Sequence, residues 1–402
     1  MLDRSSVLKW PRKAVSLALR PVWLFAGALL YLAALALSPW RILRVGLLHH
    51  DRIGHLSLNT ELFLRARAAG RIDPRDWHLI FSGEPANWQL FKMIRRRATV
   101  VRFPLSRVVY DRGVRPFFKS GSRFAANLER HNNQFFELNK VPPQLSFTPD
   151  EEAQGRRLLE SMGIPPTASF VCFHSRDKAY LDTQTYMTRS EWSYHDFRDC
   201  AIENYLPAAR ALSAQGLYAV RMGHVVERPV PAEPRIVDYA TRHRSDFGDV
   251  YLAARCKFYL GNTAGLVCVP PCFDTPVAWA NLIPIGFPPW RAADIFIPKR
   301  HWDRHEDRIL SIKEIFARKL DLAARVDQYE KAGVTLLEST PEEIDALAAE
   351  MNSRLDGTWV ENAEDARLQR SYWDAYPAGH PARPCPARIG AVFLRENPGF
   401  LA

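Results

Sequence analysis

Small and polar residues stand together where one buried strand is expected to end. Residues 257–266 (KFYLGNTAGL) are typical of a short strand, a glycine-flanked turn and the beginning of a helix. The turn holds Asn262, Thr263 and Gly265. Such a junction directs backbone N–H groups and a hydroxyl to one place, which suits a phosphate group. The alternative interpretation is a glycine turn needed only for packing.

Basic residues follow a second expected strand, residues 169–173. His174, Arg176 and Lys178 lie directly after it. A guanidinium that can donate two parallel hydrogen bonds, beside an ammonium group, suits a diphosphate. A surface loop with a local ion pair is the alternative.

A third expected strand, residues 218–222, contains Arg221 and stops at Gly223. Arg221 is expected to face a cleft at the strand's edge, where it could bind phosphate. An arginine with no such role is the alternative. Because the carboxyl ends of parallel strands meet at one edge of a sheet, the three loops together indicate a phosphate site more specifically than any one of them.

A histidine-rich turn in the first half of the chain offers a proton acceptor. His55 follows the first expected strand, and Asp51 lies in the same turn as a possible partner. An imidazole titrates near neutral pH, so His55 could remove a proton from an acceptor hydroxyl. A helix-start histidine satisfied by the backbone is the alternative. Residues 82–84, after the next strand, could line the same cleft and bind acceptor hydroxyls.

Several familiar catalytic motifs are missing from the sequence. It contains no GxxxxGK[ST] loop, no GxGxxG fingerprint and no GxSxG elbow, which disfavours P-loop kinases, standard dinucleotide-dependent dehydrogenases and serine hydrolases of that type. His301 and His305 are spaced as metal ligands could be, but they lie in a run crowded with charge. We interpret that run as a solvated charged loop and predict no metal site.

The expected elements alternate between strand and helix in two successive halves, which predicts an α/β fold with mainly parallel sheets. Ligands of such sheets are expected beyond the carboxyl ends of the strands and between the two domains. From residue 300 the chain is predicted to be charged and helical, with a capped helix from Thr340 to about Leu355. Residues 389–394 are predicted to form a strand or an apolar docking segment.

The net charge of +10 is concentrated in the first third of the chain. Residues 1–120 hold 21 Lys and Arg against 7 Asp and Glu, whereas the rest holds 33 against 37. This basic excess adjoins the most apolar segment, which favours an anionic membrane surface over nucleic acid as a partner. The six cysteines form no CxxC pair and mostly have apolar neighbours, so we predict reduced, buried thiols in a cytosolic compartment.

Residues 21–39 carry no charge and, as a helix, would be about 28 Å long, just enough to cross a bilayer core. No convincing cleavage site follows, which disfavours a removed signal peptide. A spanning helix, a helix lying in the interface and a helix buried in the protein or an oligomer contact all remain open. The cysteines and the later motifs favour a cytosolic body with an interfacial or re-entrant helix.

Residues 40–400 resemble a little-characterised family of bacterial glycosyltransferases from surface-polysaccharide gene clusters, of the GT-B type and distantly similar to fucosyltransferases and heptosyltransferases. The stretches that carry the resemblance are RIGHL at 52–56, FHSRD at 173–177, RMG at 221–223, SDF at 245–247, LGNTAG at 260–265 and FLRENP at 393–398. The stretch at 174–177 is also similar to the donor loop of fucosyltransferase-like enzymes, with one arginine where that pattern has two.

The resemblance implies two Rossmann-like domains behind the hydrophobic N-terminal helix. It divides the chain into a leader at 1–40, an acceptor domain at 41–150, a nucleotide-sugar domain at 151–300, and a helical extension at 301–402 that packs on both domains.

The implied activity is transfer of a sugar from a nucleotide-sugar to a glycan or glycolipid at the cytoplasmic face of the bacterial inner membrane, without a metal and with no cofactor beyond the nucleotide-sugar co-substrate. His55 and Asp51 are the expected catalytic pair. The expected donor-binding residues are His174, Arg176, Lys178, Arg221, Gly223, Ser245, Asp246, Asn262, Thr263 and Gly265. A non-catalytic module of the same fold, binding anionic glycolipid or a partner enzyme, and a sugar-nucleotide epimerase are the alternatives.

Overall fold

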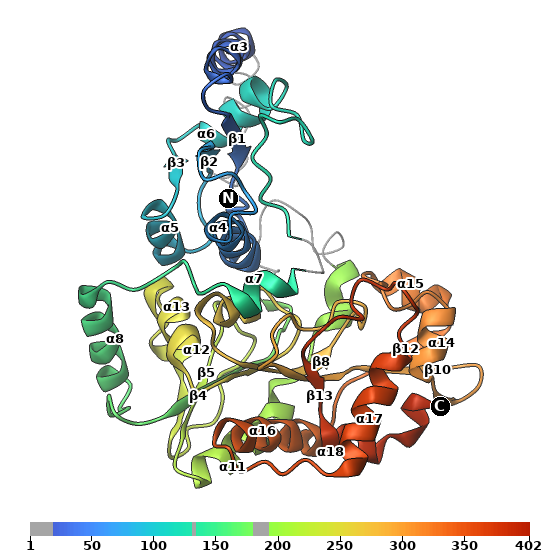
Figure 1. Ribbon diagram of the computed structural model, residues 1–402. Coiled ribbons are helices and arrows are strands. Elements are labelled where there is room, and N and C mark those ends of the chain that lie inside the picture. The colour runs from blue at the N-terminus through green and yellow to red at the C-terminus, as the bar shows by residue number, and fades with distance from the viewer. Residues whose placement is uncertain (1–18, 131–133, 180–192) are drawn as a thin grey trace, which may run out of the picture. The chain divides into compact units, whose positions relative to one another are not determined.

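The computed structural model describes residues 19–130, 134–179 and 193–402, and its contacts divide the chain into two compact units, Met1–Arg130 and His131–Ala402 (Figure 1). The boundary between the two units, after Arg130, lies earlier in the sequence than the predicted boundary after residue 150. The assignment of the four predicted segments stays a prediction. Each unit is described by itself below.

Unit 1 contains a parallel three-stranded sheet in the order β1-β2-β3. Its strands are β1 (Leu43–Leu47), β2 (Trp77–Phe81) and β3 (Thr99–Val101), with Val45 opposite Leu79 and Ile80 opposite Val100. The alternation predicted for this part is confirmed, since η1 (His55–Asn59) and α4 (Thr60–Ala68) follow β1, and α5 (Trp88–Arg95) follows β2.

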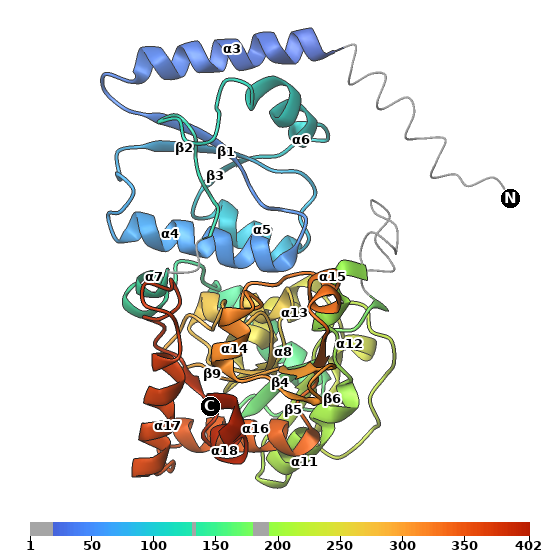
Figure 2. The same cartoon turned by 90° about the vertical axis from the view of Figure 1, so that its right-hand side faces the viewer.

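Helices cover both faces of this sheet (Figure 2). The predicted apolar helix is present as α3 (Arg20–Leu37) and lies on the face opposite α4 and α5. The short helices α6 (Ser106–Val109) and η2 (Tyr110–Val114) follow the sheet in the chain. Ala34 of α3 joins Val45, Phe81 and neighbouring aromatic residues in one buried cluster. Burial of these apolar side chains is the main force that holds the layers together.

Unit 2 is built on a seven-stranded parallel sheet in the order β13-β9-β8-β7-β4-β5-β6. Its strands are β4 (Phe170–His174), β5 (Tyr218–Arg221), β6 (Ile236–Asp238), β7 (Tyr259–Gly261), β8 (Val277–Leu282), β9 (Ile295–Pro298) and β13 (Arg388–Ile389). From the other edge the order is third, second, first, fourth, fifth, which is that of doubly wound α/β folds. The strand order therefore reverses between β4 and β7.

Helices lie on both faces of the large sheet, with α11 (Leu206–Ala214) and α16 (Pro341–Leu355) on one face and α12 (Tyr239–Arg242) and α13 (Asp246–Arg255) on the other (Figure 1). The predicted start of α16 is confirmed. The Thr340 hydroxyl accepts from the Glu343 N–H at 3.2 Å, while the Glu343 carboxylate accepts from the Thr340 N–H at 2.8 Å. This reciprocal pair satisfies two N–H groups that a helix start otherwise leaves open.

The other described helices of unit 2 are short or peripheral. They are α7 (Phe135–Lys140), α8 (Pro149–Ser161), η3 (Ser193–Arg198), η4 (Ile202–Tyr205), η5 (Leu266–Cys268), η6 (Pro270–Phe273), α14 (Ile312–Ala317), α15 (Val326–Lys331), α17 (Ala363–Asp374), α18 (Ala391–Glu396) and η7 (Pro398–Leu401). Two parallel sheets with intervening helices confirm a mixed α/β fold. Two complete Rossmann-like domains stay a prediction, since the described sheet of unit 1 has three strands.

The prediction of a charged and helical segment from residue 300 missed a sheet. A second, antiparallel sheet contains β10 (Arg300–Asp303), β11 (Arg308–Ile309) and β12 (Val334–Leu337). His301 is fully buried in β10 rather than part of a solvated loop. Burial alternates along β10, but the sequence hides this pattern because one of the buried positions is a charged residue. That residue is Asp303, and its carboxylate forms an ion pair with Arg318 at 2.6 Å.

Of the two alternatives for residues 389–394, the strand is wrong beyond Ile389, whereas the apolar docking segment is supported because Ala391, Phe393 and Leu394 are buried. Only Arg388 and Ile389 pair with β9, and α18 begins directly afterwards. The helix starts after Gly390, whose carbonyl accepts from the Leu394 N–H at 3.1 Å. All six cysteines are buried and free, as predicted.

Acid should destabilise the protein through its buried histidines. Burial lowers the pKa of His301 to about 4, below the usual 6.5. The unfolded chain therefore binds a proton at this residue between pH 6.5 and 4 while the folded chain does not, so stability falls as the pH falls. We expect His301→Leu to remove up to about 1.4 kcal/mol per pH unit of this slope, measured by urea unfolding across that range. His305→Leu, at an exposed position, is the control; equal slopes in wild type and His301→Leu would contradict the assignment.

Candidate functional site

Two of the loops singled out in the sequence meet at the carboxyl ends of β4 and β7, where the strand order of unit 2 reverses. Connections on either side of such a point leave to opposite faces of the sheet, which opens a crevice for a ligand. The link between the loops is direct, because the side-chain oxygen of Asn262 accepts from the backbone N–H of Arg176 at 2.9 Å. The structure thus brings together the β4 loop and the β7 loop.

The amide of Asn262 is used inside the protein. The residue is fully buried, and its Nδ2 donates to the carbonyl of Arg198 at 2.8 Å and to Cys200 Sγ at 3.2 Å. One side chain therefore joins the β4 loop, the β7 loop and the segment at 198–200. This makes Asn262 a positioning residue at the site, and direct contact with a donor stays a prediction.

The turn after β7 retains open hydrogen-bond donors. Among the hydrogen bonds within the described ranges, none uses the backbone N–H groups of Thr263, Ala264 or Gly265 as a donor. The Thr263 hydroxyl accepts from the Ile283 N–H at 3.3 Å, and Gly265 is exposed. The predicted strand and turn are present, but the predicted helix is a single turn, η5, so a long helix dipole is not available here.

His174 and Arg176 lie at the end of β4 with limited exposure. Burial, followed by the charges of Arg221 and Arg176, lowers the pKa of His174 to about 3, so its ring is neutral at pH 7. The Arg176 guanidinium forms an ion pair with Asp199, and only 11% of its side chain is exposed. The pair fixes the segment around residue 199 against the β4 loop.

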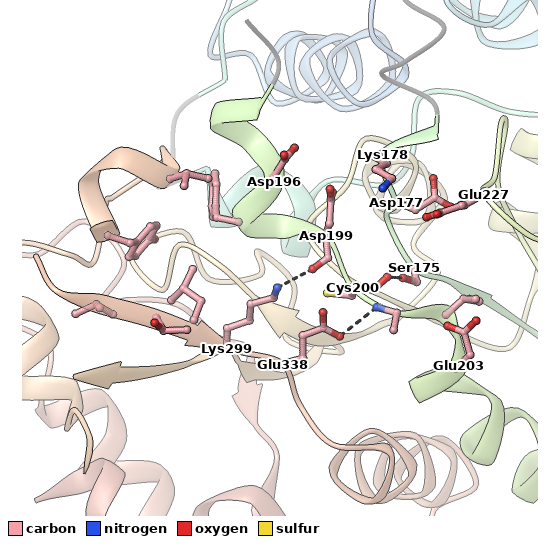
Figure 3. Close-up of a pocket in the computed structure, with 18 of the residues that line it drawn as sticks. Ser175, Asp177, Lys178, Asp196, Asp199, Cys200, Glu203, Glu227, Lys299 and Glu338 are labelled. Atoms are coloured by element: carbon pink, nitrogen blue, oxygen red, sulfur yellow. Dashed lines mark hydrogen bonds between the residues drawn. The ribbon is translucent and has the colours of Figure 1, made fainter. Parts of the chain in front are cut away.

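A cavity of about 770 Å³ opens beside the β4 loop (Figure 3). The β4 loop contributes Ser175, Asp177 and Lys178, while the opposite wall comes from α15, β12 and the two residues that flank β10, Lys299 and Arg304. Lys299 Nζ donates to the Asp199 carbonyl at 2.7 Å, and Glu338 accepts from the Ala201 N–H at 3.1 Å. These two bonds hold the residues between η3 and η4 in the wall, and the volume lies within the range of pockets that hold small ligands.

Both signs of charge line this cavity. It has seven carboxylates and four basic groups: Asp177, Asp196, Asp199, Glu203, Glu227, Glu330, Glu338, Lys178, Arg228, Lys299 and Arg304. The carboxylate of Asp177 is occupied by the backbone N–H groups of Ala179 and Glu227, at 2.9 and 3.0 Å. Lys178 is exposed, and its ammonium has no hydrogen bond or ion pair with any described residue. The lining suits a ligand with both hydroxyl groups and an anionic group.

Arg221 lies inside the sheet edge instead of facing a cleft. Its side chain is 1% exposed, and Nη1 lies 3.3 Å from Asp238 while Nη2 donates to the Arg228 carbonyl at 3.1 Å. Burial lowers the pKa of Arg221, and the neighbouring Asp238 opposes that effect. Gly223 has φ 158°, and a side chain there would collide with Val226. Both positions therefore have structural explanations, and roles in donor binding stay predictions.

Ser245 and Asp246 serve the start of α13. The Ser245 hydroxyl accepts from the Gly248 N–H at 3.0 Å, which caps the helix. Asp246 binds Arg244 at 2.6 Å, and Arg244 also binds the buried Asp249 at 2.8 Å. Neither residue lines the cavity. Of the ten predicted donor residues, only Lys178 does.

The predicted base lies in unit 1, at the first position of the π-helix η1. Burial, followed by the charges of Arg130, His49 and Arg52, lowers the pKa of His55 to about 4, so the ring is neutral at pH 7. Asp51 is exposed, and no described hydrogen bond or ion pair joins it to His55, so the structure gives no support to that pairing. Single π-helical turns are rare and frequently mark functional sites.

His50 was missed in the sequence and is the most enclosed histidine of this turn, at 8% exposure. Its Nδ1 lies 2.9 Å from the Glu84 carbonyl, and its Nε2 lies 3.1 Å from Arg107 Nη1. The ring also lies against Gly83, where an added Cβ would be 2.5 Å from Cε1. Residues 82–84, which were expected to line the cleft, thus contact the histidine turn. Gly83 is the one residue in the sequence that pointed to this contact, because only a residue without a side chain fits against the His50 ring.

No family model matches this chain, and no curated protein matches it. Some solved structures align with this chain at low sequence identity and with TM-scores below 0.5. An ADP-heptose lipopolysaccharide heptosyltransferase II of E. coli has 13% identity and a TM-score of 0.42, with 64% of this chain and 90% of that chain covered. A glycosyl transferase family 9 protein from Veillonella parvula has 11% identity and a TM-score of 0.44, with 77% and 96% covered. The E. coli heptosyltransferase WaaC with ADP has 12% identity and a TM-score of 0.28, with 64% and 91% covered.

The buried pair at the end of β5 yields a test of the site's framework. Asp238→Ala leaves the Arg221 guanidinium buried and without its carboxylate, and removing one partner of a buried pair typically costs about 3–5 kcal/mol. We expect a loss of unfolding free energy of that size in urea. Glu233→Ala breaks the more exposed pair with Arg210 and is expected to cost much less. Equal losses in the two variants would show that Arg221 does not depend on Asp238.

Proposed function

We propose that this protein is a glycosyltransferase that moves a sugar from a nucleotide-sugar donor to a polysaccharide or glycolipid acceptor. The observation that carries the proposal is the meeting of the β4 and β7 loops at the switch point of a doubly wound parallel sheet. Ligands of such sheets bind at this point. The resemblance of the sequence to GT-B glycosyltransferases uses the same two loops, at 173–177 and 260–265.

The donor's diphosphate is proposed to bind the backbone N–H groups of Thr263, Ala264 and Gly265 together with Lys178. The N–H groups are open to a ligand, and the ammonium of Lys178 is exposed. Arg176 adds positive potential while its pair with Asp199 holds the loop. The carboxylates of the adjoining cavity accept hydrogen bonds from hydroxyl groups of the ribose or the transferred sugar.

These groups also suggest how the reaction proceeds without a metal. As the bond between the sugar and the diphosphate breaks, negative charge grows on the leaving oxygen, and fixed N–H dipoles with a lysine stabilise it. The nucleotide-sugar is a co-substrate, and no further cofactor is part of the proposal.

His55 is proposed as the general base of an inverting transfer. The neutral imidazole takes the proton of the acceptor hydroxyl, the hydroxyl oxygen attacks the anomeric carbon, and the nucleoside diphosphate leaves with the electron pair. The pKa of about 4 leaves the ring unprotonated at pH 7, and it also makes this imidazole a weaker base than an ordinary histidine. Asp51 stays a predicted partner of His55, and no hydrogen bond or ion pair joins the two side chains in the described residues.

The proposed site of action is the cytoplasmic face of the bacterial inner membrane. The basic first third of the chain and the apolar helix α3 support contact with a membrane surface. Assembly of a surface polysaccharide or a glycolipid would present the acceptor at such a surface. Nucleic acid is not a proposed partner.

One observation favours a second candidate, a non-catalytic module that binds an anionic glycolipid. A groove of about 860 Å³ at the amino ends of the unit 1 strands is lined by five arginines and one carboxylate, from Asp76. The arginines are Arg41, Arg67, Arg95, Arg96 and Arg97. Such a groove could bind phosphate groups without catalysis. Turnover of a nucleotide-sugar separates the two candidates.

Donor binding is the first test. Thermal-shift titration with UDP-, GDP-, CMP-, dTDP- and ADP-sugars should identify at least one ligand. Lys178→Ala is expected to weaken its binding about tenfold, the effect of losing one charged contact worth about 1.4 kcal/mol. Arg367→Ala, an exposed change on α17, is the matched control. Failure of every nucleotide-sugar to bind the wild-type protein would overturn the proposal.

Catalysis is tested separately at His55. His55→Gln should leave donor affinity unchanged and lower kcat by about 10²–10⁴, the usual contribution of a general base. Single-turnover transfer to a membrane extract, with radiolabelled donor, measures the rate. His305→Gln, at an exposed position in unit 2, is the control. Full activity of His55→Gln would remove this residue from the mechanism.

A further inference from the structure

The helix α3 has an apolar face on each side. One side is buried through Trp23, Gly27 and Ala34. The other side exposes four large apolar residues by half or more of their surface: Val22 60%, Phe25 67%, Leu29 51% and Leu32 59%. The sequence carries no charged residue between Arg20 and Arg41. A helix on the surface of a water-exposed domain normally places polar residues on its outer side.

The inner side of α3 is held by contact between backbones. A Cβ on Gly27 would lie 2.0 Å from the carbonyl oxygen of Gly113, and a Cβ on Gly113 would lie 2.4 Å from that of Trp23. Tyr31 packs edge-on against Phe118 and Phe124, with ring centroids 5.6 Å apart in both cases. The helix is therefore an integral layer of unit 1 along much of its length (Figure 2).

This packing distinguishes two ways in which α3 could associate with a bilayer. By length and composition alone, α3 could cross a membrane. Crossing would require the helix to leave η2 and to expose the cluster around Ala34 and Phe118. A helix that lies in the plane of the interface keeps the whole inner contact and removes only its outer apolar side from water. The interfacial arrangement breaks none of the contacts between α3 and the rest of unit 1.

Basic and aromatic residues flank the apolar side. Arg20 begins the helix, while Arg41 and Arg123 lie just beyond its end with Trp40, which is 80% exposed. Arg44, in the strand that follows, is paired with Asp76 and positions Arg123. Arg44 Nη1 donates to the Arg123 carbonyl at 2.7 Å, and Arg123 Nη2 donates to Ser38 Oγ at 3.1 Å, which gathers these groups at one end. Arginine and tryptophan suit the headgroup level of an anionic membrane. A second copy of this chain would bring the same positive charges with it.

We propose that α3 lies in the plane of an anionic lipid surface as a monotopic anchor, with its outer side in the headgroup and acyl boundary and its inner side on unit 1. Val22, Phe25, Leu29 and Leu32 enter the lipid. The inference rests on the membrane association in the proposed function and does not need sugar transfer. It assigns a surface and an orientation to that association.

Flotation of the full chain with vesicles tests the anchor. We expect the wild-type protein to float with vesicles of equal parts phosphatidylcholine and phosphatidylglycerol. The double variant Phe25→Glu/Leu29→Glu should bind at least tenfold more weakly, because two carboxylates must then enter the apolar boundary. Leu322→Glu/Val360→Glu changes two exposed apolar residues of unit 2 and should bind as wild type does. Unchanged binding of the α3 variant would overturn the proposal.

Further measurements exclude the other arrangements and keep the two proposals separate. Cysteines placed at Arg20 and Trp40 in intact cells should both be unreactive toward an external, membrane-impermeant maleimide, and the buried native cysteines give little background. Reaction at one end only would show a spanning helix. A halved mass of the α3 variant in detergent-free buffer, with no vesicle binding by wild type, would show a dimer interface instead. Nucleotide-sugar binding by the α3 variant would confirm that the variant is folded. If the wild-type protein binds vesicles but no nucleotide-sugar, the result counts against sugar transfer and leaves the anchor proposal unaffected.

Discussion

The amide of Asn262 is the interaction on which the candidate site depends. A buried amide must find partners for both its oxygen and its nitrogen, because an unpaired polar group in the interior costs about 1–3 kcal/mol. Asn262 meets that demand with the Arg176 N–H and the Arg198 carbonyl. These partners lie on different segments, so one side chain sets the spacing of the loops at the switch point. The open N–H groups of the next residues are thereby held beside the β4 loop.

The charged residues around this point follow the same rule. Arg221 and Arg176 are enclosed, and each is matched by a carboxylate, Asp238 or Asp199. A buried guanidinium without such a partner would be costly, so these residues stabilise the crevice before any ligand enters. Lys178 is exposed, so its ammonium group needs no carboxylate partner from the protein. Its exposure leaves it available to an anion.

In unit 1 the helix α3 buries only one of its two apolar sides against the rest of the unit. Gly27 and Gly113 permit the backbones to touch, and Tyr31 packs edge-on against Phe118 beside them. The outer side has no protein layer within the described part of the unit. The proposed lipid surface would remove that apolar side from water without changing the fold.

Local signals in the sequence were sufficient for many of the elements and for the turn after β7, but not for the antiparallel sheet of β10, β11 and β12. The strand Trp77–Phe81, the capped helix Pro341–Leu355 and the stop at Gly261 all follow from short-range patterns of burial and capping. Only the tertiary structure decided what the polar residues do. Asp238 reaches Arg221 from the next strand, and Asn262 reaches residues more than sixty positions away. Partners of buried polar groups are chosen by chain topology, which no local pattern contains, and so the sequence could name Asn262 and Arg221 without revealing that the protein itself occupies them.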